Sequence, residues 1–327
     1  MRRAFVLAAI GALLVGGTPV VGLAQQSQTG VPPTQPQATF KSGVEVVTLT
    51  ASVRDEHGRV VKGMKASDFE VIDTGLPREI RDFYVGESPI SLAILLDISG
   101  SMAVGGNMNR AREAVDVATL NLQDTGDEAA LFTFDSKLVE VVDFTKDLGR
   151  IRRVSLEGKP WGQTSLYDAI GTAARAVGER ASKHRALLVI TDGVDTGSQL
   201  TAPQVSAIAS EIDVPVYLLT VVNPVDHPGQ EFAVLENESK RTETATLADL
   251  ARWTGGDMRI ASTLTHTEEA MYDLFNELRH QYLITFEPGA RPGWHPLEIR
   301  TRKKNLVVRA RSGYTSGPSQ SQVGSSR

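Results

Sequence analysis

The chain has 327 residues, of which 41% are hydrophobic and 22% charged, and it contains no cysteine. This composition is ordinary for a globular protein, and the lack of cysteine excludes disulfides, thiolate metal sites and a cysteine nucleophile. The formal net charge of −5 argues against broad electrostatic binding to nucleic acid, so we expect no nucleic-acid partner.

The N-terminal 24 residues have the organisation of a secretory signal peptide. Arg2-Arg3 precedes the largely apolar run Ala4–Val15, and Gly22-Leu23-Ala24 supplies small residues before a candidate cleavage point. We therefore expect residues 1–24 to be removed on export to the periplasm, the cell surface or the medium. An uncleaved membrane anchor is the alternative, because the segment could barely span a bilayer. No later segment is apolar enough to do so, and we expect no transmembrane span after cleavage.

A polar linker and a block of short strands come next. Residues 25–43 are rich in Gln, Pro, Ser and Thr, which predicts a disordered linker. Residues 44–88 predict an N-terminal β segment, because apolar and polar residues alternate around Val47–Val53 and Phe69–Val71. Turn residues at Asp73–Gly75 separate these from a further strand near Ile80.

Apolar strands alternate with helical patterns over residues 89–281. Continuous apolar runs are typical of strands that are covered on both faces, and they lie at 92–96, 130–134, 186–190 and 214–222. Helical spacing is found at 109–122, 165–181, 207–212, 246–253 and 268–279. Leu138–Val142 is predicted to pair antiparallel with the strand before it. The alternation predicts an α/β fold: a doubly wound, mainly parallel sheet with helices on both faces.

Strand character returns at the C-terminal end, at 282–286, 297–301 and 306–310. From Gly313 the composition is that of a solvated tail, and we set the C-terminal β segment at 282–315 and the disordered tail at 316–327. Neither terminal strand block is long enough for a robust core of its own. We therefore hypothesise that residues 44–88 and 282–315 form one small β-sandwich-like domain, into which residues 89–281 are inserted.

Oxygen-bearing side chains follow the apolar runs. Asp97, Ser99 and Ser101 come directly after the first run, where a tight turn at a glycine lets alternate side chains converge. Thr164 stands at the entry to a helix, and Asp192 follows another apolar run. In an open α/β sheet, ligands bind beyond the carboxyl ends of the strands. Hard oxygen donors of this kind suit Mg²⁺.

Each of these pieces has a simpler interpretation when it is taken alone. Asp97 could be an ordinary acid after a strand, and Ser99 and Ser101 could cap a helix. Thr164 alone is better explained as a helix N-cap, and Asp192-Gly193 alone as a turn. The order of the pieces along an alternating strand–helix chain is what favours a shared site.

That order resembles the von Willebrand factor type A domain. The stretches that carry the resemblance are LAILLDISGSM, ALFTFDSKLVEVVDFT, GQTSLYDAI and ALLVITDGVDTGS. The resemblance implies a metal-ion-dependent adhesion site of the DxSxS…T…D type, with Asp97, Ser99, Ser101, Thr164 and Asp192 as metal ligands. It implies Mg²⁺ as the ion, with Mn²⁺ or Ca²⁺ as substitutes, and a partner protein that presents an Asp or Glu carboxylate. The flanking segments resemble secreted bacterial proteins related to this domain.

Three classes of function follow. The first is a metal-dependent protein-binding or adhesion module, which we favour. The second is a secreted hydrolase with a serine nucleophile, but the sequence has no GxSxG elbow, HExxH helix or GxxxxGK loop, and its 6 histidines lack metal-ligand spacing. The third is a purely structural metal site. We expect no catalytic residue and no organic cofactor, and therefore a protein that is not an enzyme.

Residues near the candidate ligands give further expectations. Asp195 is predicted to be a loop or cap residue, and Asp135 a hairpin residue. Trp161 is expected either to line the rim of the site or to pack beneath its loop. The polar stretch 223–244 is long for a strand–helix connection and is either a binding loop or an insertion.

Overall fold

The computed structural model describes residues 46–123, 126–156, 159–223 and 246–317. The α/β part contains a six-stranded sheet of order β10-β9-β8-β5-β6-β7. Its strands are β5 (Ile90–Asp97), β6 (Glu128–Phe134), β7 (Leu138–Thr145), β8 (His184–Thr191), β9 (Val216–Val221) and β10 (Met258–Ala261). Every neighbouring pair is parallel except β6 with β7, which is antiparallel. The predicted mainly parallel sheet and its antiparallel hairpin are confirmed.

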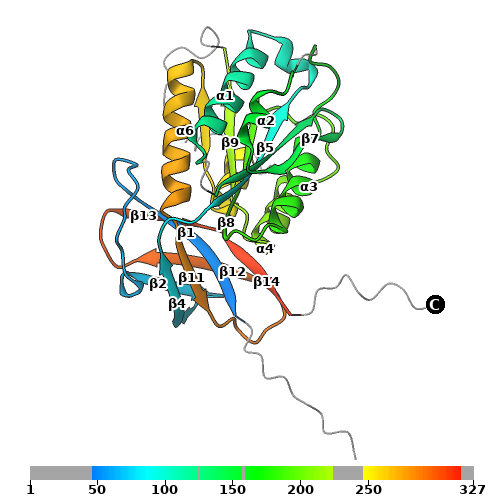
Figure 1. Cartoon of the computed structure of the whole chain (residues 1–327). Helices are drawn as coiled ribbons and strands as arrows, with labels where there is room; N and C mark the ends of the chain where they lie inside the picture. The colour runs from blue at the N-terminus through cyan, green and yellow to red at the C-terminus, as the bar shows by residue number, and fades with distance from the viewer. Residues whose placement is uncertain (1–45, 124–125, 157–158, 224–245, 318–327) are drawn as a thin grey trace, which may run out of the picture. The chain divides into compact units, whose positions relative to one another are not determined.

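Helices cover both faces of this sheet (Figure 1). One face packs against α1 (Asn107–Asn121), α2 (Leu148–Arg152) and α6 (Leu264–Arg279), and the other against α3 (Leu166–Gly178), α4 (Ala202–Glu211) and α5 (Leu247–Thr254). Side chains of β5 alternate between the two cores, so that Leu92 and Ile94 enter one while Ala93 and Leu95 enter the other. A strand that is buried on both sides needs apolar residues at every position, which explains the continuous run in the sequence.

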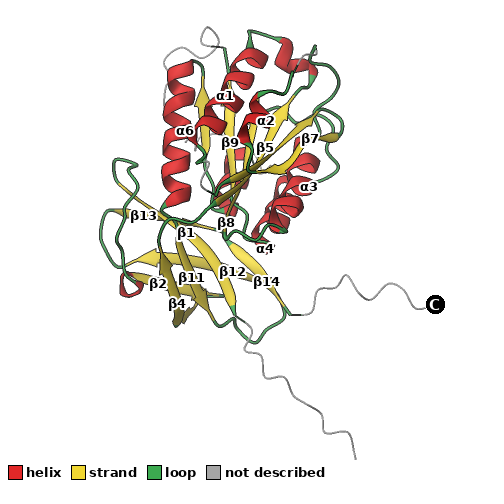
Figure 2. Cartoon of the chain, in the orientation of Figure 1, coloured by secondary structure: helices red, strands yellow, loops and turns green. Residues whose placement is uncertain are grey.

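The remaining strands form two four-stranded sheets of order β13-β1-β11-β4 and β14-β12-β2-β3 (Figure 2). They are β1 (Val47–Asp55), β2 (Phe69–Asp73), β3 (Leu76–Arg78), β4 (Ile80–Val85), β11 (Tyr282–Phe286), β12 (Gly293–Thr301), β13 (Leu306–Ala310) and β14 (Gly313–Ser316). Each sheet combines strands from before and after the α/β part. One apolar core, which includes Leu49, Phe69 and Tyr282, draws on both sheets. The predicted small sandwich of N- and C-terminal strands is confirmed.

The expected start of a solvated tail at Gly313 is wrong. Residues Gly313–Ser316 form β14, which pairs antiparallel with β12. Tyr314 is 2% exposed and its ring lies against those of Phe286 and His295. Composition missed this strand because three of its four residues are glycine or hydroxyl residues, and it is held by backbone pairing and by one buried aromatic ring.

Helix boundaries also differ from the predicted ones. The helix expected at 207–212 begins at Ala202, where Thr201 and Gln204 form a capping box. The helix expected at 268–279 begins at Leu264, because the side chain of Thr263 accepts a hydrogen bond from the backbone N–H of His266. The proline in the first turn of α4, and the polar residues in the first turn of α6, hide the start of each helix from a search for apolar spacing. The short helix α2 was not predicted.

A buried ionic cluster joins α6 to the sandwich strand β1. The carboxylate of Glu277 on α6 is fully buried and accepts hydrogen bonds from Ser52 Oγ at 2.9 Å, Arg54 Nε at 2.7 Å and Tyr217 Oη at 2.9 Å. Burial raises the pKa of Tyr217 well above its ordinary value, and the neighbouring Glu277 carboxylate adds to the effect. Tyr217 therefore remains a neutral donor. The cluster ties the end of the α/β part to β1.

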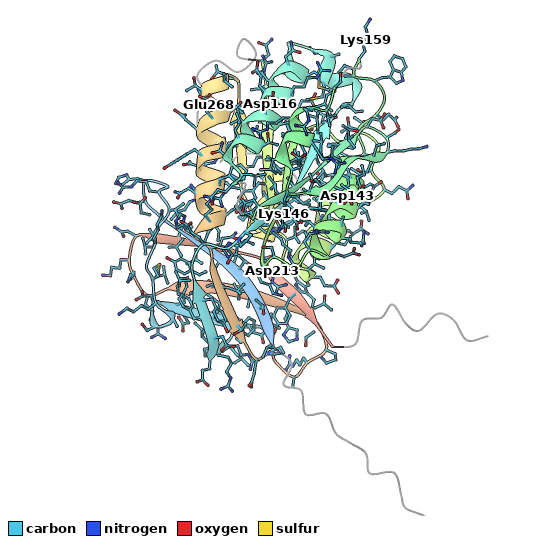
Figure 3. All side chains as sticks on the ribbon, viewed as in Figure 1. Asp116, Asp143, Lys146, Lys159, Asp213 and Glu268 are labelled. Atoms are coloured by element: carbon cyan, nitrogen blue, oxygen red, sulfur yellow. The ribbon has the colours of Figure 1, made fainter. Side chains whose placement is uncertain are left out.

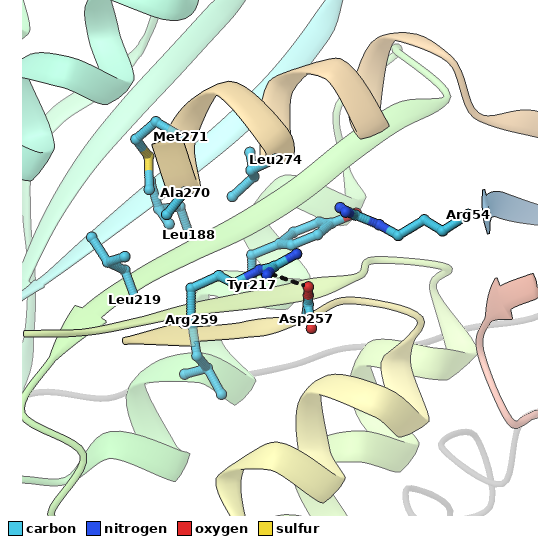
Figure 4. A pocket seen from close by; sticks show the side chains of 10 residues that line it. Arg54, Leu188, Tyr217, Leu219, Asp257, Arg259, Ala270, Met271 and Leu274 are labelled. Atoms are coloured by element: carbon cyan, nitrogen blue, oxygen red, sulfur yellow. Dashed lines mark ion pairs between the residues drawn. The ribbon is translucent and has the colours of Figure 1, made fainter. Parts of the chain in front are cut away.

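A small cavity lies beside this cluster (Figure 4). Arg54, Tyr217, Asp257 and Arg259 form its polar side, and leucine side chains with Met271 form its apolar side. Its free volume of about 10 Å³ has room for about one water molecule. The cavity is therefore too small to bind an organic ligand.

Several predicted segments lie outside the described residues. They are the signal peptide, the linker, nearly all of the 223–244 loop and the last residues of the tail. In the part of the chain that is described, no helix has the length and apolar character needed to cross a membrane.

Truncation of the β5 core is expected to destabilise the α/β part. Leu95 is 0% exposed, so Leu95→Ala should lower the free energy of unfolding by about 2–5 kcal/mol through lost burial and a residual cavity. Val139→Ala on the edge strand β7 is the control, because Val139 is 54% exposed and its truncation should cost less than about 0.5 kcal/mol. Urea denaturation followed by circular dichroism measures both values. Equal losses would contradict the assignment of β5 to the core.

Loss of Arg54 is expected to leave the buried Glu277 carboxylate with only a more distant cation, Arg309, whose Nη1 lies 3.7 Å from Glu277 Oε2. Arg54→Met should lower the free energy of unfolding by about 3–5 kcal/mol. Arg59→Met is the matched control, because the Arg59–Asp55 pair has an arginine side chain that is 74% exposed and should contribute less than about 1 kcal/mol. Denaturant titrations of the two variants check the contrast. An Arg54→Met loss no larger than that of the control would show that the cluster does not hold α6 to β1.

Candidate metal centre

Asp97 lies at the carboxyl end of β5 and is 0% exposed. Its position follows from strand register, because Leu96 of β5 pairs with Ile190 of β8 and the next residues, Asp97 and Thr191, are therefore neighbours. Thr191 Oγ1 donates a hydrogen bond to Asp97 Oδ2 at 2.6 Å, and the backbone N–H of Ser99 donates to Asp97 Oδ1 at 2.8 Å. These two bonds fix the orientation of the carboxylate.

The two serines of the DxSxS motif lie together after Asp97. Ser99 is 0% exposed and precedes the 3₁₀ helix η2 (Gly100–Ala103), which contains the half-buried Ser101. Ser99 occupies the N-cap position of η2, but its side chain makes no capping hydrogen bond. Instead its Oγ lies 3.2 Å from Ser101 Oγ. The interpretation of Ser99 as a helix cap is therefore wrong, and the two hydroxyls are paired side by side as the motif predicts.

Thr164 is 3% exposed and lies one residue before the N-cap of α3, which is Ser165. The simpler interpretation of Thr164 as the N-cap is therefore wrong. The first turn of α3 is capped by Asp195, whose Oδ1 accepts the N–H of Leu166 at 2.8 Å. The prediction that Asp195 is a cap residue is confirmed. The Thr164 side chain is thus not needed to satisfy the helix end.

Backbone hydrogen bonds join the loops that carry the five predicted ligands. Trp161 N donates to Ile98 O at 3.0 Å, and Gly100 N donates to the carbonyl of Gly162 at 3.1 Å. Thr164 O accepts hydrogen bonds from Thr196 N and Gly197 N, both at 2.9 Å. The 97–101 loop is therefore joined to the 161–164 loop, which is in turn joined to the 192–197 loop. The structure brings Asp97, Ser99 and Ser101 into one hydrogen-bonded turn, with Thr164 and Asp192 on the adjoining loops.

Asp192 supplies a second carboxylate at this edge. Its Oδ1 atom is buried and has no hydrogen-bond partner among the described residues. Burial raises the pKa of Asp97 above its ordinary value against the lowering effect of the bonds from Ser99 and Thr191, and the negative charge of Asp192 raises it further. Two carboxylates whose charges repel are thus held close together, and one of their buried oxygens is unpaired. Such an arrangement is costly without a cation.

Hydroxyl groups outnumber carboxylates in this donor set. Among the described residues, no group of three or more His, Cys, Asp or Glu side chains is placed to hold a metal ion. A metal at this edge would be held by Asp97 and Asp192 together with the hydroxyls of Ser99, Ser101 and Thr164. Oxygen donors alone, with no imidazole or thiolate, suit Mg²⁺, Mn²⁺ or Ca²⁺ rather than zinc or copper.

Loop and hairpin residues surround this edge of the sheet. Trp161 is 82% exposed, so the expectation that it packs beneath its loop is wrong, and its place at the rim of the site stays a prediction. Asp135 lies in the β6–β7 hairpin as predicted, and its Oδ1 accepts the N–H of Lys137 at 2.9 Å. Figure 3 shows Lys159 and Asp213 at opposite ends of the α/β part. Trp161 follows Lys159 by two residues in the same loop.

Thr191 follows the same apolar run as Asp192 but is not among the five predicted ligands. Its role is to orient Asp97, and its Oγ1 also accepts the N–H of Gly193 at 3.1 Å, which shapes the turn after Asp192. The sequence contained a signal for this role of Thr191. When the apolar runs that end at Leu96 and Ile190 are aligned, Thr191 lies opposite Asp97. Sequence reasoning treated the two runs separately and did not align them.

Comparisons with known proteins identify the α/β part. Residues 92–194 match the family model described as the von Willebrand factor type A domain. Similar solved structures include the conserved hypothetical protein BatB from Bacteroides thetaiotaomicron, with 19% identity and a TM-score of 0.41 over 57% of this chain and 97% of that one. Another is an aerotolerance-related membrane protein from Bacteroides fragilis, with 18% identity and a TM-score of 0.43 over 58% and 98%.

A von Willebrand factor type A protein from Catenulispora acidiphila is also similar, with 12% identity and a TM-score of 0.43 over 84% of this chain and 75% of that one. The comparison with curated proteins gave no significant match. The matched segment contains β6, β8 and most of β5, and all five predicted ligand positions fall within it. Residues 92–194 of this chain therefore match the von Willebrand factor type A domain model, over the central strands of the α/β part.

Proposed function

We propose that this protein is an exported, metal-dependent binding protein. In this proposal Mg²⁺ is held by Asp97, Ser99, Ser101, Thr164 and Asp192, and the ion binds the carboxylate of an Asp or Glu side chain on a partner protein. Mn²⁺ or Ca²⁺ could take the place of Mg²⁺ at oxygen donors of this kind. The proposal is consistent with the family of residues 92–194, whose typical role is protein interaction or adhesion.

The unpaired buried oxygen of Asp192 is the observation that carries the proposal. Asp192 Oδ1 has no hydrogen-bond partner in the described part of the chain, and its charge acts on the buried carboxylate of Asp97. Buried charges in proteins are paired or coordinate metals, because an isolated one costs several kcal/mol. A divalent cation next to both carboxylates would remove this cost. The two hydrogen-bond donors to the Asp97 carboxylate, Ser99 N–H and the Thr191 hydroxyl, are neutral and do not offset its charge.

The donor set also explains why a partner carboxylate would be attracted. Only two of the five donors carry a formal charge, and both oxygens of Asp97 already accept hydrogen bonds from the protein. A divalent ion held largely by hydroxyls and water keeps more of its positive charge than one surrounded by carboxylates. Since the Coulomb attraction grows as water is excluded, an incoming Asp or Glu side chain would then be strongly bound.

The geometry favours binding over hydrolysis. Ser99 Oγ is paired with Ser101 Oγ, whereas a nucleophilic serine needs a general base in hydrogen-bond contact. Asp97 orients the Ser99 backbone and receives the Thr191 hydroxyl instead of orienting an imidazole. These partners suit a metal site, and we propose that the protein is not an enzyme.

Export is part of the same proposal. The basic pair, apolar run and small residues of positions 1–24 support it, and they place the protein in the periplasm, at the cell surface or in the medium. The linker at 25–43 would then follow the cleaved signal. The lack of cysteine means that the fold would be stabilised outside the cell by its cores and not by disulfides.

Replacement of Asp192 is expected to separate metal binding from folding. Without divalent cations, Asp192→Asn should melt at the same or a higher temperature than the unaltered protein, because it removes one of two repelling carboxylates. Mg²⁺ at a hundredfold excess over its Kd should stabilise the unaltered protein by about 2.7 kcal/mol and leave Asp192→Asn unchanged. Differential scanning calorimetry with Mg²⁺ or EDTA measures both effects.

Asp195→Asn is the matched control for this test. It changes the same residue type three positions away, and the amide oxygen of the new Asn can still accept the Leu166 N–H that caps α3. Its stabilisation by Mg²⁺ should remain intact because Asp195 is not among the proposed ligands. If Mg²⁺ stabilised Asp192→Asn as much as Asp195→Asn, the ion would be bound elsewhere and the proposed site would be wrong.

Partner recognition is expected to need both the metal and a carboxylate. A random linear peptide library displayed on phage, selected on the full chain in Mg²⁺, should yield peptides that contain Asp or Glu and that are released by EDTA. Changing that acidic residue to its amide should reduce binding at least tenfold, and Thr164→Ala should do the same from the protein side. Enrichment that survives EDTA, or that is indifferent to the acidic residue, would argue for a structural metal only.

A further inference from the structure

Trp161 is the most exposed large apolar side chain in the described part of the chain, at 82%. Tryptophan is usually buried over most of its surface, so an indole left in solvent needs an explanation. The fold does not require this side chain, because the residue is held by its backbone, whose N–H donates to the carbonyl of Ile98 at 3.0 Å. Exposed tryptophan is also the residue type most enriched at the centres of protein interfaces.

The position of Trp161 ties it to the proposed metal ligands. Its Cα atom lies 4.0 Å from the place that a Cβ atom on Gly100 would occupy, and Gly100 stands between Ser99 and Ser101. The next residue, Gly162, has a φ of 89° and accepts the Gly100 N–H through its carbonyl oxygen. The positive φ turns the chain sharply after Trp161 and on toward Thr164. The Trp161 backbone thus lies beside the loop that carries the two serines.

Two more apolar side chains are exposed on the ligand loops. Val104 is 66% exposed, and its N–H donates to the carbonyl of Ser101 at 3.1 Å. Val194 is 50% exposed and lies two residues after Asp192. Each of the three loops that supply proposed ligands therefore also exposes one large apolar residue. We call Trp161, Val104 and Val194 the apolar rim.

Charged side chains of both signs lie around the rim. Lys137, in the hairpin beside Gly162, and Lys159, in the Trp161 loop, are both exposed. Gly162 lies next to this hairpin, because a Cβ atom there would be 3.6 Å from Asp135 Oδ2. Two lysines on a chain of net charge −5 do not make a surface that binds polyanions such as nucleic acid. They do complement the charge of an acidic peptide segment. The rim thus fits a peptide that is both acidic and apolar.

We propose that Trp161 determines which acidic segments bind. The partner's Asp or Glu would have an aromatic or large aliphatic residue one or two positions away, and that side chain would lie on the Trp161 indole. An extended chain advances about 3.3–3.6 Å per residue, so a neighbour at this spacing can reach the rim while the carboxylate faces the proposed ion. The inference rests on the proposed function, since it names the partner of that same site.

A double-mutant cycle tests this pairing directly. Peptides are selected from a phage-displayed random library on the full chain in Mg²⁺, and an enriched peptide is synthesised with a fluorescent label. Trp161→Ala should weaken its binding roughly 30-fold, and replacing the apolar neighbour of its acidic residue by Ser should weaken it similarly. The two changes together should cost little more than either alone, because they remove the same contact.

Controls separate this contact from folding and from the metal. Trp161→Ala should keep the melting temperature and its increase with Mg²⁺, because the side chain is not packed in the fold. Tyr272→Ala removes an aromatic side chain that is 66% exposed on α6 and should leave peptide binding unchanged. Additive losses in the cycle, or the same enriched sequences on Trp161→Ala as on the unaltered chain, would overturn the proposal. If acidic peptides are enriched with polar neighbours, only this inference fails, whereas binding without an acidic residue or without Mg²⁺ defeats the proposed function itself.

Discussion

The burial of β5 between β8 and β6 is the constraint on which the site depends. A strand that is paired on both edges and covered on both faces cannot move, so the residue at its carboxyl end has a fixed position. That residue is Asp97, and the register with β8 places the Thr191 hydroxyl against its carboxylate. The sheet thus holds a charged group in a place with almost no access to solvent, which only a partner charge or a cation makes favourable.

The loops beyond the sheet edge carry the other predicted ligands, and hydrogen bonds between the loops fix their positions. They contain glycine and hydroxyl residues, which pack poorly by themselves, yet backbone hydrogen bonds join each loop to the next. Asp195, in the last of these loops, caps helix α3. The Thr164 side chain is therefore not needed as the cap of that helix. Separate residues therefore satisfy the fold, while the predicted ligands lie on loops that adjoin one another. This division of roles supports a binding site rather than a set of ordinary turns.

The sandwich is built from strands that precede the α/β part in the chain and strands that follow it. Strand β1 pairs with β11 and β13, which lie more than 200 residues later in the chain, so forming this sheet closes a long loop at a cost in conformational entropy. The buried Glu277 near the end of α6 then fastens this arrangement through Arg54 and Ser52 of β1. A buried ion pair adds little net stability compared with apolar packing, but it tolerates only one arrangement of its partners. Its contribution here is to specify how α6 meets β1.

Local patterns in the sequence were sufficient for most of the fold. Apolar runs such as Leu92–Leu96 marked the buried strands, since a strand covered on both faces can be read from its own residues. The antiparallel hairpin at Leu138 and the αL glycine at Gly255 that ends α5 were also local signals. Apolar spacing did not reveal β14, which is held by backbone pairing with a distant strand and has few apolar side chains. It also did not reveal the starts of α4 and α6, whose first turns do not show apolar helical spacing.

The sequence by itself determined the identity of the candidate ligands, because their order after the apolar strands resembles one family motif. Only the tertiary structure decided what each one does. It showed that Asp97 is oriented by Thr191, that Asp195 and not Thr164 caps α3, that one Asp192 oxygen is buried without a partner, and that Trp161 lies in solvent. The physical reason is that the burial and hydrogen bonding of a residue are set by segments far from it in sequence, whereas strand and turn preferences are set by its neighbours.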